Sequence, residues 1–407
     1  MKPEEYLVRV CHSLKNPRLK EEPAIYRQFQ KLAHYILGGD FDEPIFVLDC
    51  YTTEVYPRYV QCSDCNFMAW DNHFWDIYGR FLFMYFTYIN VGCFMSKEFF
   101  VNYYKSMLLI FLANRCEKYP AFSRYLAEEY SKMDMKFPPY NEHEDVNDIL
   151  DKVGHLQEFN ISRIFGFCHE IAHVAFRKKN ALSQEVQKQV VSYSETFMKI
   201  IELKRKVYIL VGKKSDDEQE KRMLDITKKL LDNSDKKLLE EICCDIMALF
   251  VLSRYFEEEC SMTQEQIGAS LSTIHYFLVC TSWLSSSEEF WNGLREVYTN
   301  IENDNAFVDP HNPFYNLGNK ITDKCAVRTS FSFLFCKDIL KIKLDDSWVR
   351  EELNSSGFIT MLEEARGIDV MDRVLYKTKC AKTDYVHAIA HQKKKNQLIG
   401  WENKYYN

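Results

Sequence analysis

The sequence predicts an α+β fold that is predominantly α-helical, and three observations support this. Only 13 glycines and 10 prolines occur among 407 residues, about half of their usual share, which argues against a turn-dense all-β chain. Aromatic side chains make up 15% of the residues and supply ample material for a core. Residues 44–70 alone form a long stretch rich in Val, Ile, Thr, Tyr and Phe, which is typical of strands.

The N-terminal elements follow in order from these patterns. Residues 1–42 predict short helices with charged faces, and residues 44–70 predict two or three strands. Residues 73–94 and 97–132 predict long, aromatic-rich helices. Two prolines and an acidic run within residues 138–148 then predict a loop, which is the best candidate for a boundary in the chain.

The C-terminal elements are mainly helical. Apolar periodicity predicts helices in four segments, residues 146–178, 184–210, 235–256 and 262–299, the last with a Ser-rich interruption at 282–287. Ser234 or Asp235 is a suitable cap for the third of these helices. The charged run Lys213–Glu220 predicts a solvated connector. Residues 302–320 contain Asn, Asp, Pro and Gly and predict a loop, with helix resuming near residue 321.

Charge and targeting features limit the class of protein. The chain has 52 basic and 59 acidic residues, a net charge of −7, so we expect no nucleic-acid partner. The charged N-terminus has no apolar signal core, and the 14 cysteines are scattered rather than regularly spaced. These features predict a cytoplasmic, reducing location. The most apolar stretch, residues 81–95, is shorter than a membrane span, so we expect no transmembrane segment.

The strongest functional motif is an HExxH at His169, Glu170 and His173, within the segment GFCHEIAHVAF. Histidines at i and i+4 lie on one helical face, so both imidazoles can reach one metal ion, and Zn²⁺ suits neutral imidazole. Glu170 is then placed to take a proton from metal-bound water. The uncharged flanks are typical of a buried helix beneath a cleft; two histidines on a core helix are the structural alternative.

A third metal ligand is expected on the later helix, in the segment KLLEEICCDIMALF. Glu241 and Asp245 are four residues apart and share a face. We expect Glu241 to bind the metal and Asp245 to accept a hydrogen bond from the outer nitrogen of a ligating histidine. A solvated acidic pair is the alternative, but a carboxylate between Cys244 and Ile246 in an apolar run argues against it. Glu240 is an alternative ligand that would face about 100° away.

The HExxH followed by ExxxD on a later helix resembles the gluzincin class of zinc metallopeptidases. The ExxCD form is similar to the ExxAD of the ImmA/IrrE-like, Lit-like and HtpX-like groups. The resemblance implies a zincin-like catalytic core with a small mixed sheet and an active-site helix, and one Zn²⁺ per chain. It implies metal ligands at His169, His173 and Glu241, with Glu170 as the catalytic base. The interval to Glu241 is longer than in the most compact members, which implies an inserted helix and loop.

A His-Pro element and an arginine often follow in these groups. This chain has His311, followed by Asn rather than Pro, and Arg328 beyond it. By similarity, His311 is a candidate to hydrogen-bond the oxyanion of the tetrahedral intermediate, with Tyr315 as a rival. A histidine in an ordinary turn is the structural alternative.

Two other pairs have the spacing of metal ligands but lack support. Cys62 and Cys65 form a lone CxxC, which is a weak signal. His387 and His391 repeat the i, i+4 spacing without a glutamate, and the lysines that follow would repel a cation. Three cysteines adjoin the predicted site, and we expect them to be small buried packing residues rather than oxidisable thiols: Cys168, Cys243 and Cys244.

The resemblance divides the chain into three parts. Residues 1–145 form an N-terminal helical region whose strand-rich segment 44–70 is a candidate part of the catalytic sheet. Residues 146–335 form the metallopeptidase core, and residues 336–407 form a C-terminal extension. The predicted function is a zinc-dependent endopeptidase that cleaves a specific intracellular protein, by analogy in regulation or phage defence. The alternatives are a catalytically silent zinc protein with a binding or regulatory role, and a structural helical protein with a coincidental motif.

Overall fold

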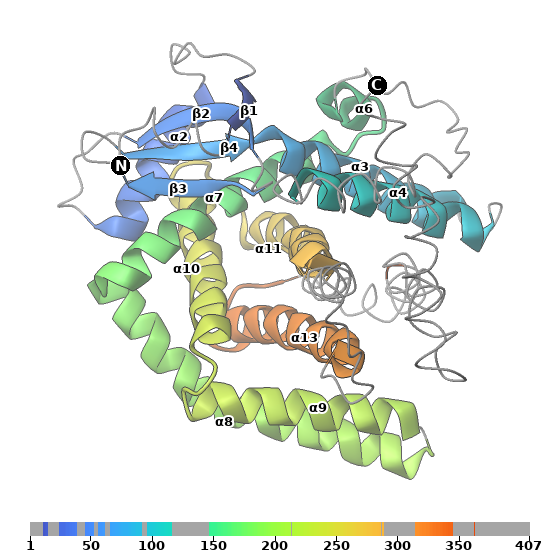
Figure 1. Cartoon of the computed structure of the whole chain (residues 1–407). Coiled ribbons are helices and arrows are strands. Elements are labelled where there is room, and N and C mark those ends of the chain that lie inside the picture. The colour runs from blue at the N-terminus through green and yellow to red at the C-terminus, as the bar shows by residue number, and fades with distance from the viewer. Residues whose placement is uncertain are drawn as a thin grey trace, which may run out of the picture.

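The computed structural model describes residues 11–14, 24–38, 45–52, 56–61, 66–91, 96–115, 146–212, 214–285, 287–288, 314–344 and 362. Within these residues the chain is mostly helical and contains one small sheet (Figure 1). The expected α+β fold with a helical majority is therefore confirmed at this level.

The sheet is mixed and has the strand order β1-β2-β4-β3. Its strands are β1 (Cys11–Leu14), β2 (Ile45–Thr52), β3 (Arg58–Gln61) and β4 (Asn66–Asp71). The strand β2 pairs in parallel with β4, whereas β1–β2 and β3–β4 are antiparallel. The strand-rich segment thus forms three strands, as expected, and β3 is an edge of the sheet.

Residues 1–42 contain the helix α2, as predicted, but residues 11–14 form the strand β1, so the helix prediction is wrong for these four residues. Four residues are too few to show a local pattern, and their extended form depends on the ladder with β2, from Cys11↔Thr52 to Leu14↔Cys50. This pairing partner is distant in the sequence, so only the tertiary structure reveals it.

Three helices follow or precede the sheet strands in the N-terminal part: α2 (Ala24–Leu37), α3 (Asn72–Val91) and α4 (Lys97–Arg115). The rest carry the metal-ligand motifs and their surroundings: α6 (Val146–Lys152), α7 (Leu156–Lys178), α8 (Ala181–Leu210), α9 (Lys214–Leu231), α10 (Lys236–Glu258), α11 (Gln264–Ser272), a helix over residues 274–285, and α13 (Phe314–Asp338). Asp235 caps α10 by accepting a hydrogen bond from the backbone N–H of Leu238.

Two segments predicted as loops are helical. Most of the charged run Lys213–Glu220 belongs to α9, which lies beside α8 (Figure 1) and buries Met223, Leu224 and Leu230. Packing against α8 provides the stabilisation that the charged sequence lacks. Residues 314–320 begin α13 rather than a loop. Pro313 directly precedes this helix, and proline favours the start of a helix. This preference is stronger here than the unfavourable effect of Gly318 within the helix.

Two other boundaries differ from expectation. The segment 146–178 is divided between α6 and α7, with Gly154 in the left-handed region at a φ of 77°. The Ser-rich stretch does not interrupt its helix at Ser282, because the helix runs on to Ser285. The break falls instead at Thr273, a turn residue between α11 and helix 274–285.

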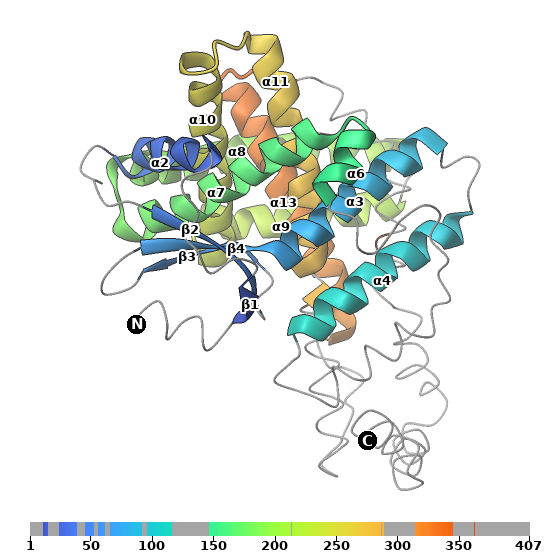
Figure 2. The same cartoon turned by 90° about the horizontal axis from the view of Figure 1, so that it is seen from above.

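The helices α7 and α10 form the centre of the core. They contact each other, and α2, α8 and α11 contact both of them (Figures 1 and 2). Phe29 of α2 stacks on Phe167 of α7 with ring centroids 4.1 Å apart. Gly166 allows close aromatic packing, since a Cβ there would lie 3.0 Å from Trp75. A rigid, apolar surround therefore holds the HExxH helix.

Among the described residues, one helical stretch is long and apolar enough to be compared with a membrane span. It covers Gln264–Ser285, with a mean hydropathy of 1.2, and 72% of the window is buried inside the protein. Buried core helices commonly pass the same comparison.

Candidate metal centre

The HExxH residues lie on the buried part of α7. His169 and His173 converge, with their Nε2 atoms 3.1 Å apart. Ligand atoms of His169, Glu170 and His173 all lie within 4.8 Å of one another, so this cluster could hold a metal ion. The two histidines are one helical turn apart, and residues at i and i+4 share a face of the helix, so the helix itself brings them together.

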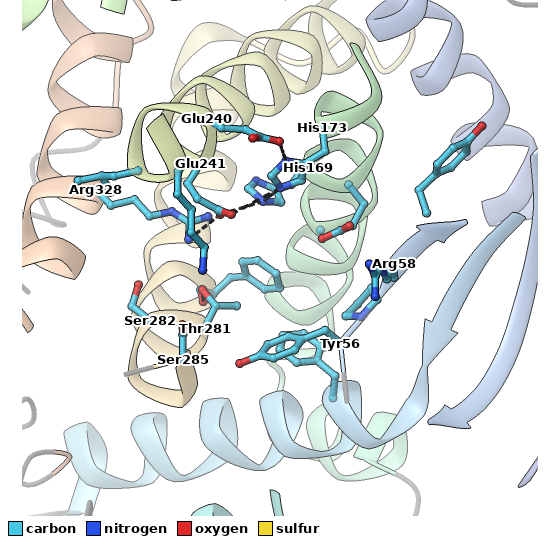
Figure 3. A pocket seen from close by; sticks show the side chains of 18 of the residues that line it. Tyr56, Arg58, His169, His173, Glu240, Glu241, Thr281, Ser282, Ser285 and Arg328 are labelled. Atoms are coloured by element: carbon cyan, nitrogen blue, oxygen red, sulfur yellow. Dashed lines mark hydrogen bonds and ion pairs between the residues drawn. The ribbon is translucent and has the colours of Figure 1, made fainter. Parts of the chain in front are cut away.

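The carboxylate of Glu241 faces both imidazoles from α10 (Figure 3). Its oxygens lie 3.5 Å from Nε2 of His169 and 3.7 Å from Nε2 of His173. Ligand atoms about 2.0–2.1 Å from a tetrahedral zinc are about 3.3 Å apart. The distances of 3.5 and 3.7 Å involve different oxygens of Glu241, Oε2 and Oε1, so the carboxylate as a whole faces the two Nε2 atoms and could complete a metal site with them.

Each imidazole also has a carboxylate at its outer nitrogen. Nδ1 of His169 lies 2.9 Å from Oδ1 of Asp245. Nδ1 of His173 is hydrogen-bonded to Oε1 of Glu240 at 2.8 Å. An ionised carboxylate can only accept, so Nδ1 of His173 donates to Glu240 and its Nε2 is left to face the site. Nδ1 of His169 lies at ion-pair distance from Asp245 without the geometry of a hydrogen bond. The two Nε2 atoms and the Glu241 carboxylate face one another, an arrangement that a cation between them would stabilise.

Arg328 of α13 links two of these carboxylates. Its guanidinium donates to both oxygens of Asp245, at 2.6 and 2.8 Å, and lies 3.1 Å from Glu241. Asp245 is fully buried, and burial would raise the pKa of its carboxyl, but Arg328 outweighs this and holds the pKa below its usual range. A buried carboxylate is therefore paired and stays ionised.

The pKa of His169 reports the same electrostatics. Burial alone would lower this pKa, but Asp245 and Glu241 raise it to about 10. In the metal-free protein a proton on Nε2 supplies the positive charge that the site requires. A metal ion that displaces this proton meets the same stabilising charges.

Glu170 has the opposite environment from Asp245. Burial raises the pKa of this carboxyl, although His173 and His169 partly oppose the shift. A carboxyl with a raised pKa is a better proton acceptor than an ordinary surface glutamate. Glu170 is half-buried and lines the pocket, so it can be reached from solvent.

The cluster opens into a pocket of about 680 Å³. One wall is the edge strand β3 and its approach, with Tyr56 and Arg58, and the opposite wall is helix 274–285, with Ser282 and Ser285 (Figure 3). The other lining side chains that matter here are His169, Glu170, His173, Glu240, Glu241, Phe277 and Arg328. The site is thus accessible to a molecule larger than water.

Several predicted residues lie outside the described part of the chain. They are His311, the CxxC pair Cys62 and Cys65, and the pair His387 and His391. The backbone of Tyr315 belongs to α13, but its side chain is outside the description. The oxyanion role of His311 or Tyr315 therefore stays a prediction.

The contacts of Glu240 and Arg328 were missed from sequence. Glu240 was considered only as an alternative ligand, whereas it contacts the outer nitrogen of His173. A usable signal existed. When two helices run antiparallel, a later residue of one meets an earlier residue of the other, so Asp245 opposite His169 places Glu240 opposite His173. The resemblance points to Arg328 as an arginine beyond the motif, but its contacts with Asp245 and Glu241 could not be predicted, because its helix begins 56 residues after α10 ends.

The cysteines around the site are free and buried, as expected for packing residues. Cys244 also contacts the ligand set, since its Sγ lies 3.4 Å from Nδ1 of His173. Burial raises the pKa values of the Cys243 and Cys244 thiols, so both are protonated at neutral pH.

No family model, curated protein or solved structure matches this chain. The feature that indicates the class of the protein is the site itself, an HExxH helix with a carboxylate pair on a second helix.

Proposed function

We propose that this protein is a zinc-dependent endopeptidase. One observation carries the proposal: the Nε2 atoms of His169 and His173 and the Glu241 carboxylate converge within 3.1–3.7 Å, with Glu170 beside them in an open pocket. Two imidazoles and one carboxylate are a donor set of catalytic zinc sites, which leave a fourth position for water.

The residues of the chain would divide the work. When bound, zinc supplies Lewis acidity and lowers the pKa of a coordinated water toward about 7. Glu170 takes the proton of the attacking water and delivers it to the amide nitrogen that leaves. Asp245 and Glu240 orient the two imidazoles, and Arg328 keeps Asp245 ionised.

The pocket supports a protein or peptide as the substrate. The edge strand β3 borders it, and Arg58 and Tyr59 of this strand line it. An edge strand has unpaired backbone groups on one side, and an extended peptide can add to it by main-chain hydrogen bonds. Such binding would lay the scissile peptide across the pocket. Cleavage in a cytoplasm, in regulation or phage defence, remains a prediction.

The decisive variant is Glu170→Gln, which keeps the shape of the side chain but removes the base. We expect cleavage to fall about 10²–10⁴-fold, because general-base catalysis contributes that much, while bound zinc stays near one per chain. The measurement combines metal analysis with proteomic comparison of cells that express the wild type or the variant.

The outcomes separate the competing functions. Undiminished cleavage by the zinc-loaded variant would contradict the mechanism. Zinc in the wild type without cleavage of any protein would favour the catalytically silent zinc protein. A wild type that binds no zinc, or one whose zinc survives His169→Ala, would contradict the metal site itself.

A further inference from the structure

The end of α8 carries a concentration of exposed apolar side chains. Among the described residues, eight large hydrophobic side chains are exposed, and five of them lie within the nine residues Leu203–Val211: Leu203, Val207, Ile209, Leu210 and Val211. Leu210 is 84% exposed, the largest fraction among them. The other three are scattered over different elements: Ile89, Val153 and Ile339. A cluster of this kind marks an interaction surface, whereas single exposed side chains do not.

The cluster forms a stripe on one helical face. Leu203, Val207 and Leu210 follow the i, i+4, i+7 pattern, so they line up along α8. Phe197 and Ile201 are buried and lie on a different face of the same helix, where α8 packs in the protein. The stripe therefore points away from the packing of α8 with α9. We call residues Lys199–Val211 the α8 tip.

Basic residues border this stripe. The sequence of residues 199–215, KIIELKRKVYILVGKKS, contains six basic residues and one acidic residue, the exposed Glu202. On a helical projection, exposed Lys204 lies on one side of the stripe, and exposed Lys199 and Lys206 lie on the other. The acidic start of α9 is partly neutralised, since Arg205 pairs with Asp217 at 2.6 Å.

We propose that the α8 tip docks onto an anionic lipid surface. Helices that lie in a membrane interface present an apolar face bordered by lysines, whose long side chains reach the headgroups. The net charge of −7 repels an anionic surface elsewhere on the chain, so the basic tip is the part that approaches. A second copy is disfavoured, because its lysines would face those of the first.

The position of the tip fits this role. The α8–α9 hairpin is inserted between the HExxH helix and the Glu241 helix, and Figure 1 shows it along the edge of the molecule opposite the sheet. Docking through the α8 tip would therefore leave the pocket open to a substrate. The proposal is independent of peptidase activity, because none of the tip residues belongs to the metal site.

The test is sedimentation of the full chain with vesicles of phosphatidylcholine alone or with about one third phosphatidylglycerol. We expect binding only to the anionic vesicles, and we expect it to weaken as salt rises from about 0.1 M to about 1 M. Leu210→Glu should weaken binding about tenfold or more, because it removes the most exposed apolar side chain and adds a repelled charge. The matched control is Ile339→Glu, an exposed isoleucine of the same protein far along the sequence, which should bind as the wild type does.

A second variant separates charge from apolar insertion. The double change Lys204→Gln and Lys206→Gln keeps the stripe and should reduce binding to anionic vesicles. The proposal would be overturned if the wild type bound neutral and anionic vesicles equally, or bound neither. It would also be overturned if Leu210→Glu and Ile339→Glu weakened vesicle binding equally. Capture of an acidic polypeptide such as polyglutamate without vesicle binding would also overturn it and indicate a protein partner. Zinc content and circular dichroism of each variant verify the fold independently.

Discussion

At the scale of single residues, three neighbouring acidic side chains of α10 have different partners. Glu241 faces the Nε2 atoms of both histidines, whereas Asp245 and Glu240 each face one outer nitrogen. Asp245 is buried under Arg328, and Glu240 is half-buried at the pocket. Side chains of one chemical type thus make two kinds of contact, with the inner or with the outer nitrogen of an imidazole. In the proposed zinc site, the first contact would bind the metal and the second would orient the ring.

Glu240→Gln tests this division at the less buried position. The amide keeps the shape but loses the charge that fixes the tautomer of His173, and loss of such a partner lowers metal affinity about 10–100-fold. Competition with a chromophoric zinc chelator measures the change. The control is Glu257→Gln, an exposed glutamate of the same helix, which should leave the affinity unchanged. Equal affinities of the two variants would show that Glu240 does not position His173.

At the scale of elements, α7 and α10 carry all the proposed metal ligands, and helix 274–285 forms the wall of the pocket opposite β3. This helix packs against α13 through His275, whose ring centroid lies 6.1 Å from that of Phe333. His275 is buried, and among the described residues its Nδ1 has no hydrogen-bond partner. Burial lowers the pKa of His275 to about 4. The contact between these elements is therefore sensitive to acid.

We expect His275→Leu to become more stable relative to the wild type as the pH falls. Burial keeps His275 neutral in the folded protein. Above pH 6.5, the pKa of this histidine in the unfolded chain, the residue is neutral in both states and does not change the free energy of unfolding. Between pH 6.5 and about 4, protonation of the unfolded chain costs the wild type stability, up to about 3 kcal/mol. Denaturant unfolding of both proteins across this pH range measures the difference. A difference that does not change with pH would contradict the expectation.

At the scale of the whole molecule, the metal centre joins distant parts of the chain. The histidines come from α7, Glu241 from α10, and Arg328 from α13, and these helices are separated by the α8–α9 insertion and by residues 259–313. A metal ion held by the two histidines and Glu241 would link α7 to α10 in the folded state only, and Arg328 attaches α13 to this pair through Asp245 and Glu241. The binding free energy of the ion would therefore add to the stability of the entire core.

Removal of zinc should lower the stability of the whole core. At free zinc about 1,000 times the dissociation constant, the bound ion adds about 4 kcal/mol to the free energy of unfolding. We expect a chelator to lower the melting temperature of the wild type and to have no effect on His169→Ala. Calorimetry with and without the chelator provides the measurement. A chelator effect of equal size in both proteins would contradict the proposed ligands.

The sequence by itself determined the parts that depend on short-range geometry. Helical periodicity aligned His169 with His173 and Glu241 with Asp245, because residues four apart share a face whatever the rest of the chain does. It also indicated the strands between residues 44 and 70 and the helical majority. The tertiary structure alone decided β1, the helical start of α9, and the pairing of Arg328 with Asp245. Each of these depends on a partner distant in sequence, whose position follows from packing rather than from local pattern.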